Sequence, residues 1–314
     1  MRIVDFDSSH TEEARLIAIQ NYNEEREHVP ELPGAGAFPE LVSFAANGLG
    51  VAAFEEDRMI GFLCCYEPRL KAFNSQAKGT FSPIHAHAAV RENRGMIYKK
   101  MYQAAAGKWI KQEILYHAIA LYAHDIEAKD AWFTCGFGLR CVDAVRPMAA
   151  FQCSLCKGIS FEELAASDIK DIRGLRRSLT EHMGSSPCFM YTAPEDFEKW
   201  LDLKEKHNSR VFVARDNQRL IAFVEITDDG ENFATEEASM VNICGAFCLP
   251  EYRGRDIYQN LLNHTILQMS REGYKILGVD FESFNPTANG FWLKYFTAYT
   301  NSVVRRVDEC ALHD

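Results

Sequence analysis

The segment from Val241 to Leu262 reads VNICGAFCLPEYRGRDIYQNLL, and it places a strand, a turn and a helix in immediate succession. Its first eight residues are mostly small, β-branched or apolar, which is typical of a buried strand. Pro250 ends this strand because proline cannot donate a hydrogen bond to a neighbouring strand. From Ile257 onward, apolar residues recur with helical spacing and predict an amphipathic helix. The turn between strand and helix reads RGR.

A strand, a glycine turn and a helix N-terminus in this order favour anion binding. The free backbone N–H groups and the helix dipole point at one place. We therefore expect the turn Gly254–Tyr258 to bind phosphate groups, with Arg253 and Arg255 adding positive charge. Asp256 supports an alternative interpretation. A carboxylate at a helix N-terminus satisfies the same N–H groups and repels an anion.

This segment resembles the acyl-CoA-binding segment of the GNAT acyltransferase superfamily. The family pattern is Arg or Gln, two residues, Gly, one residue, and then Gly or Ala. Arg253 fits the first position, whereas Asp256 and Tyr258 stand where the family usually has small residues. Downstream, the sequence NPTA at residues 285–288 is similar to the family's Asn-x-x-Ala helix. In that helix a tyrosine often protonates the leaving thiolate, and Trp292 occupies its position.

The chain contains an internal repeat. The sequence RMIGF at residues 58–62 matches RLIAF at residues 219–223. Further residues that have a counterpart 160 positions later are Ile97, Tyr98, Ala128 and Trp132. Landmarks in the same order at a nearly constant separation indicate two similar halves. The turn after Arg94 is one residue shorter than the turn after Arg253, so the second half fits the family motif better.

Alternating strands and helices in each half predict an α/β class, with an α+β mixed sheet. The expected strands lie at residues 2–6, 50–54, 59–66, 83–90, 117–124, 139–146, 210–228 as a hairpin, 241–249, 279–283 and 299–307. The expected helices lie at residues 11–24, 96–112, 128–135, 167–182, 194–206, 257–269 and 285–296. The junction 147–158 contains apolar residues and is no polar Gly/Ser linker, so we expect the halves to be coupled.

The resemblance implies a tandem duplicated GNAT acyl-CoA N-acyltransferase fold. Residues 1–150 would form an N-terminal GNAT-like domain with a degenerate cofactor turn. Residues 158–314 would form a C-terminal GNAT domain with the acetyl-CoA site.

The bulk properties are those of a soluble globular protein. A length of 314 residues predicts two domains, and a net charge of −10 argues against nucleic acid or an anionic membrane as a partner. No apolar run approaches the length of a membrane span. The ten cysteines are scattered, which suits reduced thiols in a cytoplasm. We therefore expect a cytoplasmic monomer or homodimer.

The resemblance implies direct transfer of an acetyl group from acetyl-CoA to an amine, with no metal. Main-chain groups near Phe247–Leu249 would bond the pantetheine arm, and the turn 254–258 would hold the pyrophosphate. The predicted cofactor-binding residues are Phe247, Cys248, Leu249, Arg253, Gly254, Arg255, Asp256, Ile257, Tyr258 and Asn285. Asn285 either contacts the pantetheine arm or forms an Asx turn with Pro286.

The motif does not place the acid and the base of the reaction. Candidate acids are Tyr258, Tyr295 and Tyr299. Candidate bases or ligands of a substrate amine are Asp280 and Glu282, which share a strand face, and Glu225 on the hairpin. Indole releases no proton at accessible pH, so we expect Trp132 and Trp292 to pack against the sheet.

The histidines of the first half offer a further hypothesis. His85 and His87 face one side of a strand in the first half, and His117 and His124 lie on the next strand. Imidazoles on adjacent strands can converge on a metal, but no carboxylate or thiol spacing accompanies them. We therefore expect them to pack in the sheet or line a pocket.

Two more features carry weaker predictions. Cys153 and Cys156 form a lone C-x-x-C pair without two further metal ligands. His182 precedes a loop that GNAT folds often close over the acceptor.

The leading functional hypothesis is an acetyl-CoA-dependent N-acetyltransferase that acts on a small-molecule or peptide amine. The alternative is a non-catalytic acyl-CoA-binding or regulatory GNAT-like protein, in which Asp256, Tyr258 and the two tryptophans record lost chemistry. A third possibility is a small-molecule-binding module that uses the histidines of the first half. The fold does not specify the acceptor, because GNAT folds serve many substrates.

Overall fold

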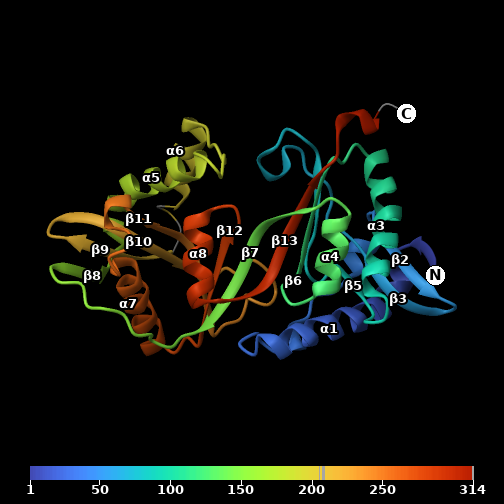
Figure 1. Ribbon diagram of the computed structural model, residues 1–314, viewed down its shortest axis with the longest axis horizontal. Coiled ribbons are helices and arrows are strands. Elements are labelled where there is room, and N and C mark those ends of the chain that lie inside the picture. The colour runs from blue at the N-terminus through green and yellow to red at the C-terminus, as the bar shows by residue number, and fades with distance from the viewer. Residues whose placement is uncertain (205, 207–208, 313–314) are drawn as a thin grey trace. The chain divides into compact units, whose positions relative to one another are not determined.

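A computed structural model describes residues 1–204, 206 and 209–312 (Figure 1). The chain forms two compact units. The first contains Met1–Asp143 together with the residues from Ala298 onward, and the second contains Ala144–Thr297. The predicted division into residues 1–150 and 158–314 assigns the C-terminal segment to the second half, whereas its packing assigns it to the first unit.

The second unit is built on a mixed sheet in the order β12-β11-β10-β9-β8. Its strands are β8 (Ile159–Glu163), β9 (Arg210–Asp216), β10 (Arg219–Thr227), β11 (Met240–Cys248) and β12 (Ile276–Glu282). Only the β11–β12 pair is parallel among them. The helices are α5 (Arg173–Gly184), α6 (Pro194–Lys204), α7 (Ile257–Arg271) and α8 (Pro286–Tyr295).

Alternate residues of this sheet face opposite helices, because strand side chains alternate between the two faces. Val213, Phe223 and Phe247 pack with Leu175 of α5 in one buried cluster. On the other face, Phe212 contacts His264 of α7, with ring centroids 6.2 Å apart. Figure 1 shows α5 and α7 on opposite sides of β9, β10 and β11.

The first unit repeats this arrangement with more elements. One antiparallel sheet has the order β1-β2-β3-β5, and four further strands have the order β4-β6-β13-β7. The strands are β1 (Arg2–Asp5), β2 (Val51–Glu55), β3 (Arg58–Leu63), β4 (Gly79–Ser82), β5 (His87–Ala89), β6 (Tyr116–Tyr122), β7 (Gly138–Pro147) and β13 (Thr297–Arg306). The helices are α1 (Thr11–His28), α2 (Val42–Ala45), α3 (Arg94–Lys111) and α4 (Ile126–Thr134).

The predicted repeat is present in the folded chain. Strands β6 and β12 begin 160 residues apart, and α3 and α7 end 160 residues apart. The residues that cap α4 and α8, Asp125 and Asn285, keep the same separation. The predicted class, an α/β fold with a mixed sheet and a tandem duplication, is confirmed.

The last strand of the chain belongs to the first unit. Strand β13 pairs with β6 in antiparallel register, from Thr300 opposite Tyr122 to Arg306 opposite Tyr116. Val303 is fully buried in the core of that unit. The first unit therefore depends on residues from both ends of the sequence.

Several predicted elements differ in their bounds. Of the expected strand 83–90, only β5 (His87–Ala89) is a strand, because the chain turns just before it, where Ala86 N–H donates to the Pro83 carbonyl. Strand β4 (Gly79–Ser82), which precedes this turn, was not predicted. The expected helix 167–182 begins as a 3₁₀ helix, Ala166–Ile172, before α5. Strand β8 was not predicted. Helix α6 ends at Lys204, and residue 205 of the expected helix 194–206 lies outside the described residues.

Within the described part of the chain, none of the helices is both long enough and apolar enough to cross a membrane. All ten cysteines are free thiols.

We expect a chain that ends after Phe296 to lose the cooperative folding of its first unit. This truncation removes the β13 partner of β6 and the buried Tyr299 and Val303 side chains. Deleting large core side chains costs about 2–5 kcal/mol each, against a total stability of about 5–15 kcal/mol. Hydrogen exchange should show β6 unprotected in this variant. A control chain that ends after Asp308 keeps β13 and should exchange like the full chain; equal protection of β6 in both variants would contradict this role of β13.

Candidate functional site

The second unit contains a split between two neighbouring strands. Strands β11 and β12 pair only from Met240 opposite Ile276 to Ile243 opposite Val279. Strand β11 nevertheless continues to Cys248. Over this last part, β10 is the only described strand with which it pairs. The two strands therefore separate beyond Ile243, and backbone groups of β11 face the gap.

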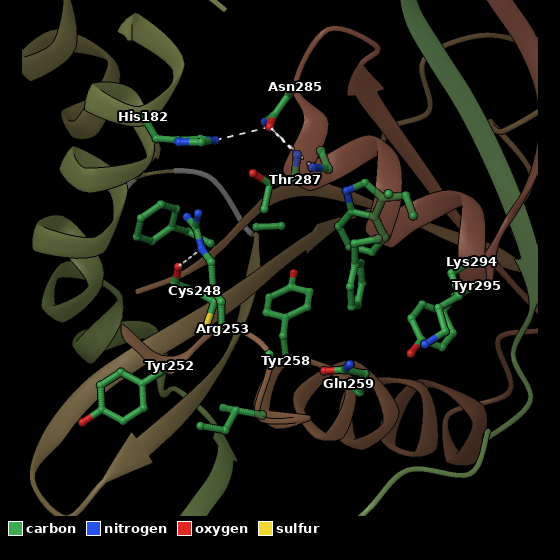
Figure 2. A pocket seen from close by; sticks show the side chains of 18 of the residues that line it. His182, Cys248, Tyr252, Arg253, Tyr258, Gln259, Asn285, Thr287, Lys294 and Tyr295 are labelled. Carbon is green, nitrogen blue, oxygen red and sulfur yellow. Dashed lines mark hydrogen bonds between the residues drawn. The ribbon is translucent and has the colours of Figure 1, made fainter. Parts of the chain in front are cut away.

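A cavity of about 370 Å³ opens beside this split. Its walls come from β11, the turn before α7, the first turn of α7, the end of α5 and helix α8 (Figure 2). Its size falls within the range of small-molecule sites. The elements that line it are those of the predicted anion-binding segment and of the NPTA helix.

The turn before α7 has an open, strained backbone. Gly254 has φ +72°, and a Cβ added there would meet nothing within 4 Å. Asp256, the residue before α7, has φ +57°, which is the left-handed region that favours glycine. Its carboxylate makes no capping hydrogen bond, so the predicted alternative of a plain Asp256 cap is wrong.

Arg253 points into the cavity rather than away to solvent (Figure 2). Its Nε donates to the Cys248 carbonyl at 3.0 Å, and its guanidinium lies 5.4 Å from the centre of the Phe247 ring. The side chain lines the cavity together with Phe247 and Cys248. Arg253 is therefore placed to hold an anion, whereas Arg255 lies over Tyr252 and does not line the cavity.

Tyr258 projects from the first turn of α7 into the cavity (Figure 2). Its ring makes edge contacts with Phe291 and Trp292, with centroids 5.0 and 6.0 Å away. The hydroxyl is buried and has no hydrogen-bond partner among the described residues. Burial raises the pKa of this phenol, and nearby Cys248 adds to the effect. Tyr258 is therefore a neutral phenol whose hydroxyl lacks a partner, and such a group favours a polar ligand.

Asn285 caps helix α8 at the opposite wall. Its Oδ1 accepts from the backbone N–H groups of Thr287 and Ala288, at 3.2 and 3.4 Å. The same oxygen lies 3.3 Å from His182 Nε2, which comes from α5 (Figure 2). Asn285 therefore orders the N-terminus of α8 and the end of α5 across the cavity.

The structure brings together only part of the predicted site. Among the predicted cofactor residues, those that line the cavity are Phe247, Cys248, Arg253, Gly254, Ile257, Tyr258 and Asn285. Leu249, Arg255 and Asp256 do not line it.

The candidate acids and bases are also divided. Tyr295 lines the cavity, with its ring stacked on Phe151 at 4.7 Å. Tyr299 is fully buried in the first unit, so its prediction as an acid is wrong. Glu282 lies at the end of β12, outside the cavity wall. Trp292 is 5% exposed, which agrees with the predicted packing role.

Glu225 is held by two cations beneath the split. Its carboxylate lies 2.9 Å from Arg176 and 3.1 Å from Lys204, and both Glu225 and Arg176 are 1% exposed. Burial disfavours the charged form, but these cations outweigh it, so the pKa of Glu225 is lowered. A Cβ at Gly245 would lie 3.1 Å from a Glu225 oxygen, so only glycine fits there without displacement. Glu225 thus fixes the backbone at the split and is a poor base.

A second cavity of about 310 Å³ lies on the other side of Gly245 along β11. It is lined by Asn242 and Cys244 of β11, Asp280 of β12 and the acidic residues Asp229 and Glu231. Burial raises the pKa of Glu231. The two cavities therefore adjoin successive parts of the same strand, one beside a helix N-terminus and the other beside carboxyl groups. Asp280 thus lies with the acidic cavity, a placement that the strand pattern alone did not reveal.

The corresponding cleft of the first unit is closed. Helix α3 begins at Arg94, so a helical turn replaces the glycine turn. Arg94 is buried and bonds Glu24 at 2.8 Å and Asp125 at 3.0 Å. A Cβ at Gly95 would lie 3.3 Å from the Glu127 carbonyl of α4, so α3 and α4 are in close contact.

The strand gap of the first unit is filled by a side chain. The imidazole of His87 on β5 contacts the Ala120 carbonyl of β6 at 2.6 Å and the Tyr98 hydroxyl at 3.2 Å. Burial lowers the pKa of His87 and of His117 to about 4. His117 is likewise bonded in the core, to Tyr102. These histidines pack in the sheet, and the described residues contain no group of three or more metal-ligating side chains.

Comparison with known proteins agrees with this geometry. Residues 176–296 match the model of the acetyltransferase (GNAT) family. The matched segment lies within the second unit and contains β9–β12 and α6–α8. No curated protein matches the chain in sequence.

Solved structures support the fold. The GCN5-related N-acetyltransferase from Sphaerobacter thermophilus is 13% identical, and the match covers 97% of this chain and 95% of that one, with a TM-score of 0.58. A GCN5-related glucosamine N-acetyltransferase region in a fungal multi-domain GH3 β-N-acetylglucosaminidase is 10% identical, covering 96% of this chain and 38% of that one, with a TM-score of 0.53. At these identities the similarity shows the fold alone.

We expect Glu225→Gln to destabilise the second unit by about 3 kcal/mol, because it leaves Arg176 buried without its counter-ion. Because the folded-state pKa of Glu225 is lowered, its contribution is complete above the unfolded-state pKa of about 4.3 and is lost as pH falls through the folded-state value. The gap between wild type and variant should therefore shrink below about pH 4.

Urea unfolding at pH 7 and at pH 3.5 measures this gap. The control is Glu251→Gln, which removes an exposed ion pair with Arg219 and should leave the free energy of unfolding nearly unchanged. Equal destabilisation by the two variants would contradict a special role for the buried carboxylate.

Proposed function

We propose that the second unit catalyses acetyl-CoA-dependent N-acetylation of an amine by direct transfer. The observation that carries this proposal is the cavity between the split strands and the N-termini of α7 and α8, inside the segment that matches the GNAT family. The first unit would contribute no acyl-CoA site, because Arg94 and His87 fill the places that the cofactor needs.

The residues of the cavity fit an acyl-CoA molecule. Arg253 and the free N–H groups at the start of α7 would hold the pyrophosphate. Backbone groups of β11 at Phe247 and Cys248 would hold the pantetheine arm, as an added strand would. Gly254 leaves room for the phosphates because a Cβ there would meet no neighbour. When bound, acetyl-CoA supplies a reactive thioester.

Tyr258 is the proposed acid. Its neutral hydroxyl points into the cavity without a partner, and it comes from α7 rather than from the helix that carries the tyrosine of the family. A hydrogen bond from this hydroxyl would stabilise the departing thiolate, whose own pKa of about 8.5 makes it a fair leaving group. Trp292 would support the ring of Tyr258 by packing.

The acidic cavity is the proposed acceptor side. Asp280, Asp229 and Glu231 would attract an ammonium group, and a carboxylate there could accept its proton before attack. Lys204 lines the same cavity, but it is neutralised by Glu225. The acceptor is therefore proposed to be a basic amine that enters beside β12.

A non-catalytic acyl-CoA-binding protein is the second candidate. The Asp256 carboxylate next to the phosphate turn and the absence of the family's tyrosine at Trp292 favour it. Incubation with acetyl-CoA and a panel of amines separates the two functions. Acetylated product should be detected by mass, because ten free cysteines would react with a thiol reagent. Binding of CoA without any acetylated product would support the second candidate.

We expect Asp256→Gly to raise CoA affinity by about 3- to 10-fold. The change removes a carboxylate near the bound phosphates and gives the left-handed position its preferred residue. Titration calorimetry on the full chain measures the affinity. Met96 occupies the same place in the first half, so Met96→Ala is the matched control and should change nothing. A loss of affinity at unchanged melting temperature would show that Asp256 organises the site.

We expect Tyr258→Phe to lower turnover by about 10- to 100-fold with CoA affinity nearly unchanged, because only the hydroxyl is lost. Trp292→Phe should keep most activity, and Trp292→Tyr should raise turnover or leave it alone, because the role of Trp292 is packing. Steady-state kinetics with one accepted amine measures all three variants. Full activity of Tyr258→Phe would remove Tyr258 as the acid, and Tyr295→Phe would then be the next test.

A further inference from the structure

The first unit has a cavity of its own, which the proposed reaction does not use. It measures about 470 Å³ and lies between the C-terminal half of α1, the start of α3 and the end of β6. Every residue that lines it belongs to the first unit. This volume is sufficient for a small molecule.

The lining of this cavity is rich in hydrogen-bond acceptors with negative charge. Its carboxyl groups are Glu24, Glu25, Glu27, Asp125 and Glu127. The guanidinium groups that line it are those of Arg91 and Arg94. The imidazoles of His28 and His124 also line it. Five carboxyl groups against two guanidinium groups and two imidazoles favour a cation.

Arg94 is not available to an anion. One terminal nitrogen forms an ion pair with Glu24, the other donates a hydrogen bond to Asp125, and Nε donates to the Ala89 carbonyl at 3.2 Å. Glu25 is fixed as well, because its two oxygens accept from the backbone N–H and the Nδ1 of His124 at 3.1 and 2.8 Å. The exposed Glu27 and Glu127 remain to meet a ligand.

A buried hydroxyl supplies an independent observation. Tyr122, at the end of β6, lines the cavity and is 5% exposed. Its hydroxyl has no hydrogen-bond partner among the described residues. Leaving a buried hydroxyl unpaired costs free energy, so such a group favours a ligand that completes its bonding. A phenol oxygen accepts from an N–H donor, as the carboxylates do.

We propose that this cavity binds a small organic cation with a primary ammonium group, such as an aliphatic diamine. An ammonium group has three N–H donors and no acceptor, which matches a wall of carboxylates and a phenol oxygen. A divalent metal fits less well, because no three ligating side chains converge within the described residues. The site is separate from the proposed acetyl-transfer site in the second unit.

Titration calorimetry of the full chain with 1,4-diaminobutane tests the proposal, with 1,4-butanediol as an uncharged probe of equal length. The diamine should bind and the diol should not. Tyr122→Phe should weaken binding by about 3- to 10-fold, which is the effect of one lost hydrogen bond. Glu27→Gln, an exposed change that cannot disturb the core, should weaken it by about 2- to 5-fold. Glu12→Gln, an exposed change at the other end of α1, should leave it unaltered.

The proposal is overturned if the diamine does not bind, if the diol binds as well as the diamine, or if magnesium ions bind in its place. It is also overturned if Tyr122→Phe and Glu27→Gln both leave diamine affinity unchanged, because the ligand would then occupy another site.

Discussion

The separation of β11 from β12 beyond the Ile243–Val279 pair is the constraint on which the site depends. It leaves backbone groups of β11 facing a cavity, and the buried Glu225 carboxylate between Arg176 and Lys204 keeps the glycine beside it in place. Along β11 beyond this pair, one cavity adjoins the N-termini of α7 and α8, and the other adjoins Asp280 of β12. In the proposed reaction, a donor with phosphate groups and an acceptor with a positive charge would meet at this point of β11.

In the first unit, the corresponding gap between strands and the corresponding glycine turn are both filled. His87 bridges β5 and β6, and the extra helical turn that begins at Arg94 occupies the place of the glycine turn. Arg94 then joins α1 to the cap of α4 through Glu24 and Asp125. Where the second unit has the glycine turn, the first unit has a helical turn, an ionic network and a polar cavity lined by carboxyl groups. Its dependence on β13 also ties its folding to the end of the chain.

Much of the fold could be predicted from the sequence, because hydrophobic periodicity and the repeat are local signals. The turn 254–258 and the NPTA cap were likewise readable, and they do lie together around one cavity. The direction of individual side chains could not be predicted from the sequence. Arg255 lies over the Tyr252 ring instead of lining the cavity, and the Asp256 carboxylate makes no capping hydrogen bond to α7. The place of β13 and the burial of Tyr299 follow from long-range pairing, for which an alternating strand pattern gives no partner.

Hydrogen exchange of the full chain with and without saturating CoA tests the central claim most directly, because it reports both halves in one experiment. We expect new protection at residues 253–262 and 285–290 and none at residues 93–98, where α3 begins. Protection at the start of α3, or equal protection in both halves, would show that the closed cleft of the first unit opens for the cofactor and would contradict the account.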